Sequence, residues 1–355
     1  MRALAVAIAA SLSAACASPD TALPGSYVDG AGAADAQWLR DRELDWARFE
    51  TNEFHAGSPV NALASIARRR LEPAWAPAGI YHASDWANAW RTLETLSDGR
   101  DFIGLYLLDV LLAPDDAMFA PELKPRIEAE LLATKLWYTQ PTPPGKHDDA
   151  YYWTENHQAI YRTIEYLLGR RYPDRLIGTD GRLGRDHAAD AKAALMRWME
   201  NRLRFGFSEW HSNVYYQKDL TPMLSLVEHA DEPEVATRAA MVVDVLLVDL
   251  ATHTLKDAFG VTHGRSYKKD KMSSTDEDTW DVTKMIFGQS AYDYGGDDPG
   301  AAIFATTTKY TLPEVVRRIA ADPGPAVIRE RMSLPIPEAQ PVDASIEQGA
   351  YGFRY

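Results

Sequence analysis

The sequence predicts an all-α protein, either an (α/α) toroid or an incomplete barrel of about six helical hairpins. Apolar residues recur with helical spacing in nearly every segment after Trp38, and clean alternation of apolar and polar residues is scarce. Three short polar clusters also recur at one interval, with Thr154, Ser208 and Thr262 each 54 residues apart. A period of this size accommodates two helices and their loops, so equivalent units are expected to stack. An open helical solenoid is the alternative.

The helical spacing predicts ten helices. They cover residues 60–71, 84–96, 99–112, 121–138, 153–170, 186–204, 218–230, 233–257, 276–288 and 312–321. Pro233 in a first helical turn agrees with the start of its helix. The stretch from Met241 to Leu255 is apolar on almost every face, which predicts a helix buried inside the protein. It is short for a membrane span.

The N-terminus is typical of an export signal. Residues 1–17 combine Arg2, an apolar run and several small residues around Cys16, the only cysteine. The segment resembles a bacterial lipobox, with Ser13 where Leu is usual. We therefore expect a periplasmic or outer-membrane-anchored lipoprotein acylated at Cys16, or alternatively a secreted protein cleaved by ordinary signal peptidase. One cysteine cannot form an intramolecular disulfide.

Three further segments follow the signal. Residues 18–37 are rich in Ala, Gly, Asp and Pro, which predicts a flexible tether. Residues 38–332 are expected to form the helical-hairpin domain. Residues 333–355 begin with alternating prolines and are interpreted as a linker or a truncated end.

Composition and charge limit the partners. The chain is 46% hydrophobic and 25% charged, which is ordinary for a globular protein, and its net charge is −14. A surplus of acidic groups disfavours non-specific binding to nucleic acid, because phosphate binding needs Lys and Arg. A local basic pocket can still bind an acidic ligand. Contact with a membrane is expected only through the N-terminal lipid.

The first cluster combines aromatic and polar side chains at the start of a predicted helix. Trp153 offers a flat apolar face for a sugar ring, and Asn156 can hydrogen-bond to a sugar carboxylate or hydroxyl. Glu155 and His157 are candidate substrate-binding groups beside them. The alternative is structural: Thr154 caps the helix, and Glu155 lies in its first turn.

The second cluster places proton-transfer groups between two predicted helices. His211 can exchange a proton near neutral pH, and Tyr215 or Tyr216 can do so if a cation lowers its pKa. Glu209 and Trp210 precede them and are candidate substrate-binding residues. The alternative is a polar loop in which His211 is simply hydrogen-bonded.

The third cluster lies in the most basic stretch of this acidic chain. Arg265 can bind a carboxylate through two parallel hydrogen bonds, and its charge favours ionisation of Tyr267. His263 is a candidate substrate-binding residue. Lys268 and Lys269 are interpreted as solvated surface side chains.

The sequence has no motif that predicts a cofactor. His157, His211 and His263 recur along the chain, but none stands in a short metal-binding spacing such as HExxH. A Gly-rich phosphate loop and a nucleophile elbow are also absent. We therefore predict no metal and no organic cofactor.

Residue order in these clusters suggests a family. From Trp153 to Tyr267, an Asn, a His, a Tyr and an Arg follow one another in an exported chain of helical hairpins. This order resembles the (α/α)-toroid polysaccharide lyases that act on alginate, glucuronan and chondroitin-type chains. The resemblance implies β-elimination at a uronic acid in an acidic polysaccharide or oligosaccharide, without a cofactor. The resemblance does not extend to the β-sandwich that follows the toroid in many of these lyases, which no segment of this sequence predicts.

The resemblance also implies roles for individual residues. Asn156 corresponds to the group that neutralises the uronate carboxylate, with Glu209 as a possible helper. His211 corresponds to the base or its partner. Tyr216, or failing that Tyr267, corresponds to the proton shuttle to the departing glycosidic oxygen. Arg265 corresponds to the group that binds the acidic sugar.

Two other functions fit the same residues. A glycoside hydrolase on the same fold would use Glu155 and Glu209 as its carboxylate pair, about 6.5–9.5 Å apart for inversion. A non-catalytic lipoprotein that binds glycans or scaffolds a partner would have its clusters scattered, without a common cleft.

Overall fold

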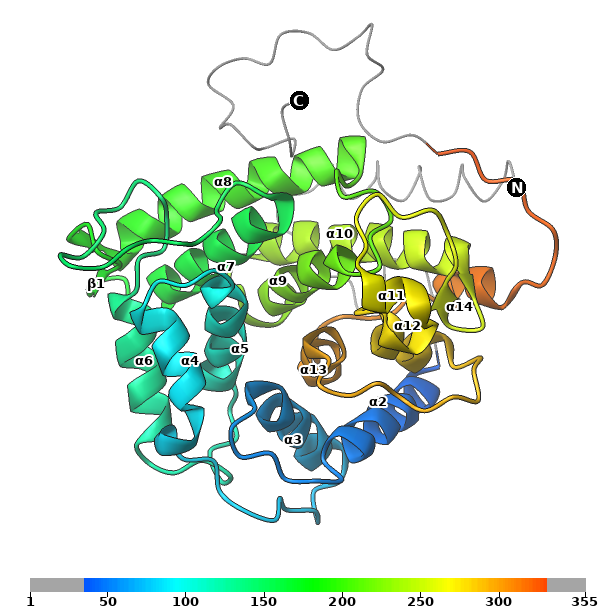
Figure 1. The fold of residues 1–355 in the computed structure, drawn as a ribbon, viewed down its shortest axis with the longest axis horizontal. Coiled ribbons are helices and arrows are strands. Elements are labelled where there is room, and N and C mark those ends of the chain that lie inside the picture. Colours follow the sequence, from blue (N-terminus) through cyan, green and yellow to red (C-terminus); the bar gives the residue numbers. More distant parts are fainter. Residues whose placement is uncertain (1–34, 331–355) are drawn as a thin grey trace, which may run out of the picture.

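The computed structural model describes residues 35–330 (Figure 1). The predictions for the signal at 1–17, for acylation of Cys16, for the linker at 333–355 and for most of the tether at 18–37 fall outside this range. Helix α2 begins at Ala36, two residues inside the predicted tether. Asp35 caps it by accepting hydrogen bonds from two backbone N–H groups of the first turn.

The described chain is predominantly helical, which confirms the all-α class. The helices are α2 (Ala36–Glu50), α3 (Pro59–Leu71), η1 (Ala83–Trp86), α4 (Ala87–Glu94), α5 (Arg100–Leu112), α6 (Leu123–Ala133), α7 (Glu155–Arg171), α8 (Gly184–Phe205), α9 (Tyr215–His229), α10 (Pro233–His253), α11 (Lys268–Met272), η2 (Ser274–Asp276), α12 (Trp280–Phe287), α13 (Pro299–Thr306) and α14 (Glu314–Ala321). Two antiparallel pairs of two-residue strands complete it, β1 (Leu176–Ile177) with β2 (Arg182–Leu183) and β3 (Thr254–Leu255) with β4 (Ala258–Phe259).

The predicted helices correspond to observed ones, with differences at their ends. The helix predicted over 233–257 stops at His253, because the chain turns into the β3–β4 hairpin. Lys256 and Asp257 form that turn with positive φ, which helical periodicity does not reveal. Helices α2, α11 and α13 were not predicted as separate helices; α11 and α13 are too short for a clear period. Among the described helices, none is long and apolar enough to cross a membrane.

Five helices form a closed circuit of contacts. Helix α3 contacts α5, α5 contacts α7, α7 contacts α9, α9 contacts α13, and α13 returns to α3 (Figure 1). Helices α2, α8, α10 and α12 each pack against a member of this circuit from their own hairpin. The interior between the two sets is one continuous hydrophobic core that reaches from Trp46 to Ala320. The helices predicted to pair along the chain therefore do pair.

The N-terminal ends of the circuit helices meet on one face. His157 in the first turn of α7 contacts Asp101 in the first turn of α5. Gln217 in the first turn of α9 donates to Asp298, the N-cap of α13. The N-cap of α3, Ser58, in turn contacts the neighbouring Asp297. Because backbone N–H groups are exposed at helix N-termini, this face carries the positive ends of five helix dipoles.

Arg70 on α3 joins three helices. Its Nη2 donates to the Glu43 carboxylate of α2 at 3.0 Å and to the Ala305 carbonyl of α13 at 2.7 Å. Burial raises the pKa of Glu43 to about 7, and the charge and hydrogen bond of Arg70 oppose that shift only in part. The ionised carboxylate is therefore less favourable in the folded chain than in the unfolded chain.

We expect Glu43 to make stability depend on pH. Its folded pKa lies above its unfolded value, so its contribution is complete below about 4.5 and is lost as the pH rises through about 7. The loss is on the order of 3 kcal/mol. Urea unfolding on both sides of this window should show a smaller fall for Glu43→Gln than for the native chain. Glu53→Gln, which alters an exposed carboxylate, is the control, and equal falls in Glu43→Gln and the native chain would contradict the assignment.

Candidate functional site

The three polar clusters lie side by side, and hydrogen bonds join them at the interval seen in the sequence. The Glu209 N–H donates to the Glu155 carboxylate at 3.5 Å, and the Gly264 N–H donates to the Trp210 carbonyl at 2.8 Å. Both pairs are 54 residues apart. A Cβ on Gly264 would lie only 3.1 Å from the Cβ of Trp210, so this close approach favours glycine. The repeated positions therefore contact one another directly.

The carboxylate of Glu155 joins the first two clusters. It accepts hydrogen bonds from the backbone N–H and the hydroxyl of Ser208, both at 2.7 Å, and forms an ion pair with Arg202 at the end of α8. Its own backbone carbonyl accepts from the Trp198 indole at 3.0 Å. Both charged side chains are buried. Glu155 is thus held by structural partners and faces away from solvent.

Ser212 joins the second cluster to the third. Its hydroxyl donates to the Arg265 carbonyl at 2.7 Å and accepts from the Tyr215 N–H at 3.0 Å, at the start of α9. The neighbouring Asn213 donates to the Asp270 carbonyl of α11 at 3.2 Å. These contacts fix α11 and the third cluster against the beginning of α9.

A connected group of side chains forms around Arg265. Its Nη1 pairs with the Glu209 carboxylate at 2.6 Å, and its Nη2 and Nε donate to the Tyr267 hydroxyl at 2.7 and 3.1 Å. The guanidinium also lies 3.9 Å from the centre of the Tyr215 ring. The two tyrosine hydroxyls are 2.7 Å apart. We call Glu209, Arg265, Tyr215 and Tyr267 the arginine–tyrosine group.

The members of this group differ in how far they are buried. Glu209 is buried, whereas Tyr267 is 45% exposed. Burial raises the pKa of Glu209, against the hydrogen bond and charge of Arg265. Burial and the hydrogen bond to Tyr267 raise the pKa of Tyr215. The group thus contains one exposed side chain, Tyr267, whose hydroxyl is bonded to a guanidinium that a buried carboxylate holds in place.

His157 connects this group to α5. Its Nδ1 lies 2.6 Å from the buried Asp101 carboxylate, and its ring packs against Phe102 at 5.0 Å between centroids. Burial raises the pKa of Glu209, and the charge of His157 is among the influences that lower it, after the hydrogen bond and the charge of Arg265. Asp101 thus occupies Nδ1 of a ring that is itself buried, at 7% exposure.

Two exposed aromatic side chains, Tyr151 and Trp153, continue outward from the His157 ring. Tyr151 stacks beside the His157 ring at 6.5 Å, and Trp153 meets Tyr151 edge-on at 5.2 Å. Trp153 is 50% exposed. These rings offer the apolar faces that carbohydrate rings stack on.

Two predicted site residues are buried instead. Asn156 is fully buried, and its side-chain oxygen accepts from the Thr154 hydroxyl at 2.7 Å. Tyr216 lies inside the hydrophobic core, where its hydroxyl donates to Asp249 on α10 at 3.1 Å. Both side chains face the space between helices, because the first residues of α7 and α9 already pack against their neighbours. Neither reaches solvent.

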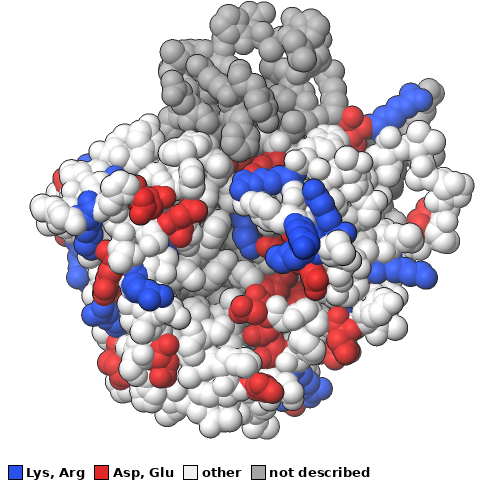
Figure 2. All heavy atoms as spheres, viewed as in Figure 1, with Lys and Arg blue, Asp and Glu red and all other residues white. Residues whose placement is uncertain are grey.

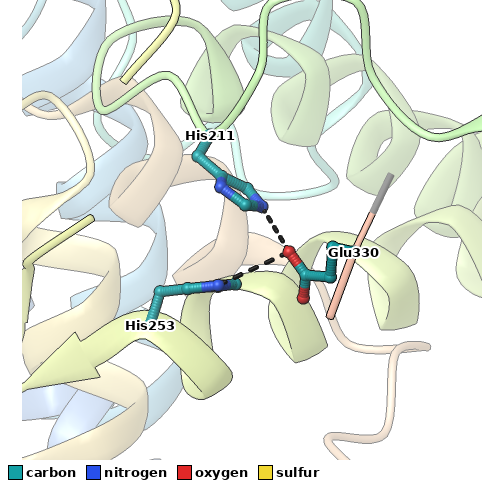
Figure 3. A group of neighbouring side chains, drawn as sticks. All are labelled: His211, His253 and Glu330. Atoms are coloured by element: carbon teal, nitrogen blue, oxygen red, sulfur yellow. Dashed lines mark ion pairs between the residues drawn. The ribbon is translucent and has the colours of Figure 1, made fainter. Parts of the chain in front are cut away.

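His211 lies outside the arginine–tyrosine group and contacts a second set of side chains. It is 2% exposed, its φ is +43°, and its Nε2 lies 2.9 Å from the Glu330 carboxylate (Figure 3). His253 at the end of α10 approaches the same oxygen at 3.4 Å. His263 Nδ1 donates to the His211 carbonyl at 2.5 Å. Burial, with the nearby charges of His253 and His263, lowers the pKa of His211 to about 4.

Acidic residues of the protein form ion pairs with some of the basic side chains near the third cluster. Figure 2 shows Lys and Arg gathered over α11, beside a hollow near the middle of this face. Lys269 pairs with Asp270 and Asp278, and Lys218 at the start of α9 also pairs with Asp278.

A separate open depression of about 1100 Å³ lies beside the N-terminal ends of α3 and α13, with Glu50, Glu53 and Asp297 in its lining.

The structure thus brings the three segments together but divides their side chains between two neighbourhoods. Glu209, Tyr215, Arg265 and Tyr267 form one group with His157 beside it, and His211 belongs to the other. Sequence reasoning did not single out Asp101, His253 or Glu330, because each lies far along the chain from the cluster it contacts. His253 carries one recognisable signal: a polar residue closing a helix that is apolar on almost every face.

Comparisons of this chain with protein-family models, with curated proteins and with solved structures find no match. Its function must therefore be inferred from the chemistry of its own residues.

We expect Glu155 to be essential for stability. Glu155→Gln removes the carboxylate that pairs with the buried Arg202, which should lower the free energy of unfolding by about 3–5 kcal/mol. Replacing both residues, in Glu155→Gln with Arg202→Met, should recover much of that loss, because the buried charge is gone. Urea unfolding of the two single variants and the double variant measures this coupling. Additive effects in this cycle would show that the pair does not act as a unit.

Proposed function

We propose that the protein is an exported polysaccharide lyase that cleaves a uronic-acid-containing polysaccharide by β-elimination. One observation carries the proposal: the hydroxyl of the exposed Tyr267 accepts two hydrogen bonds from Arg265. These two donors, together with the Tyr215 hydroxyl, hold the Tyr267 oxygen in one position, where it can exchange a proton with a bound sugar. The residue order that resembles toroid lyases supports the same reaction class.

In the proposed reaction Tyr267 acts as base and then as acid. Its phenolate takes the proton from C5 of the uronate, the C5–H electrons form the C4–C5 double bond, and the C4–O bond breaks. The departing glycosidic oxygen then takes the proton back from Tyr267. Tyr215, whose hydroxyl is 2.7 Å from that of Tyr267, relays or holds the proton between these steps. The enzyme returns to its starting state without a cofactor.

Loss of the C5 proton requires that the uronate carboxylate be neutralised. We assign this role to His157 in place of Asn156, because Asn156 has no exposed surface, whereas His157, although also buried at 7% exposure, packs beside the exposed Tyr151 ring. Asp101 orients the imidazole through its contact with Nδ1. Glu209 holds Arg265 in position, and Trp153 and Tyr151 supply stacking faces for neighbouring sugars.

The contacts between helices also support the more specific prediction of an (α/α) toroid of about six hairpins. Five helices contact one another in a circuit, and the N-terminal ends linked by polar contacts lie on the face that carries His157 and Tyr215. Positive helix ends around a site favour an anionic ligand. Export as a lipoprotein remains the proposal made from residues 1–17.

The hydrolase alternative is less well supported. It requires Glu155 as one of two catalytic carboxylates, yet Glu155 is buried and bound by Arg202 and Ser208. A carboxylate with these partners cannot approach a glycosidic bond without breaking the link between the first two clusters.

A panel of acidic polysaccharides tests the reaction class. Incubation with a polyuronate should produce chains with an unsaturated uronate end, which absorbs in the near ultraviolet. Neutral polysaccharides should give no such signal. New reducing ends without ultraviolet absorbance would identify a hydrolase, and neither product from any polyuronate would contradict the proposal.

We expect Tyr267→Phe to lower kcat by a factor of about 100 or more, since it removes the group that moves the proton. Arg265→Lys should also lower kcat strongly, because a single ammonium cannot reproduce the two hydrogen bonds of the guanidinium to the Tyr267 hydroxyl. Initial rates read by ultraviolet absorbance measure both effects.

Two further variants act as controls for these rates. Tyr292→Phe alters an exposed tyrosine away from the three clusters and should retain full activity. Tyr216→Phe removes only the contact with Asp249 and should retain most activity. A severe loss in Tyr216→Phe with an active Tyr267→Phe would move the proton shuttle to Tyr216.

A further inference from the structure

Three potential metal ligands converge beside the second cluster. The Nε2 atoms of His211 and His253 and a carboxylate oxygen of Glu330 all lie within 4.8 Å of one another (Figure 3). They come from the segment before α9, the last residue of α10 and the segment after α14. Two imidazole nitrogens and one carboxylate oxygen form a donor set that catalytic zinc sites use.

The spacing fits a tetrahedral ion. Bonds of 2.0–2.1 Å at the tetrahedral angle separate two ligand atoms by about 3.4 Å. The observed separations from the Glu330 oxygen are 2.9 Å to His211 and 3.4 Å to His253. A small rotation of the Glu330 side chain would make room for the ion between the three atoms.

The two histidines are oriented before any ion binds. His253 Nδ1 lies 2.9 Å from the Asp249 carbonyl one turn earlier in α10, so it carries the proton and Nε2 presents its lone pair to the cluster. His211 is held in the left-handed region, with φ +43°, which costs free energy for a residue with a Cβ. The hydrogen bond from His263 to the His211 carbonyl fixes this backbone.

We propose that His211, His253 and Glu330 bind a Zn²⁺ ion, with the fourth tetrahedral position open to water or an exogenous ligand. The inference goes beyond the proposed lyase activity and does not rest on it, because the arginine–tyrosine group uses none of these three side chains. The ion would join the segment after α14 to α10 and to the second cluster. This proposal also replaces the sequence-based predictions that His211 is a base and that the protein binds no metal.

Metal binding by the full-length protein tests the proposal. The protein is stripped with a chelator and titrated with Zn²⁺ alone by calorimetry, and the metal content is measured after dialysis. We expect about one Zn²⁺ per chain with a Kd below about 1 μM. Co²⁺ in place of Zn²⁺ should give the visible absorption bands of a four- or five-coordinate site.

Variants identify the ligands. His253→Ala should weaken Zn²⁺ binding by at least about 100-fold, and Glu330→Gln by at least about tenfold. His147→Ala removes an exposed histidine that also pairs with a carboxylate, Asp149, and should bind Zn²⁺ like the native chain. Glu330→Gln alters a partly exposed side chain at the edge of the fold, so it provides a test even if His253→Ala fails to fold.

Two results would overturn the proposal. One is the absence of stoichiometric Zn²⁺ binding by the folded native chain. The other is binding whose affinity is the same in the native chain, His253→Ala and Glu330→Gln, which would place the ion elsewhere. In both cases the two histidines and Glu330 form only an ion-paired contact. Lyase activity is measured in a separate assay. Failure of the Zn²⁺ proposal therefore does not contradict the proposed lyase activity, and failure of the lyase proposal does not contradict the Zn²⁺ site.

Discussion

The buried carboxylate of Glu155 is the contact on which the arrangement of the candidate site depends. It binds Ser208 and Arg202 at once, so the start of α7, the end of α8 and the segment leading to α9 share one fixed point. From there the chain of contacts runs through Glu209 to Arg265 and Tyr267. Glu155, in the first polar cluster, thus has a structural role, and the exposed Tyr267 lies three contacts away, through Glu209 and Arg265.

Much of the architecture could be predicted from the sequence. Helical spacing located most helices, and the interval of 54 residues predicted which distant segments would touch, as the Glu155–Glu209 and Trp210–Gly264 pairs show. Such predictions succeed because periodicity is a local property and stacking follows from it. Short elements such as α11 and the β3–β4 hairpin could not be predicted in this way. Two to five residues are too few to show a periodic pattern of apolar residues, and the turns of these elements depend on tertiary contacts.

The direction of individual side chains could not be predicted. The sequence treated Asn156, His211, Tyr216 and Arg265 as one set, yet a residue near a helix start can face the core or the solvent depending on how its helix is rotated. Tyr215 and Tyr216 illustrate this: adjacent on α9, one contacts Tyr267 at the surface and the other contacts Asp249 in the core. The left-handed backbone of His211 turns its ring toward α10, and no sequence pattern signals that turn.

The sharing of Asp278 by Lys218 and Lys269 has a consequence for how a charged polymer would associate. Both ammonium groups are largely neutralised by the protein itself, and the Arg265 charge is likewise balanced by Glu209. These three cations therefore contribute little long-range attraction on a polyanion. Association should respond only weakly to ionic strength, and the choice among polymers would depend on short-range fit at close contact.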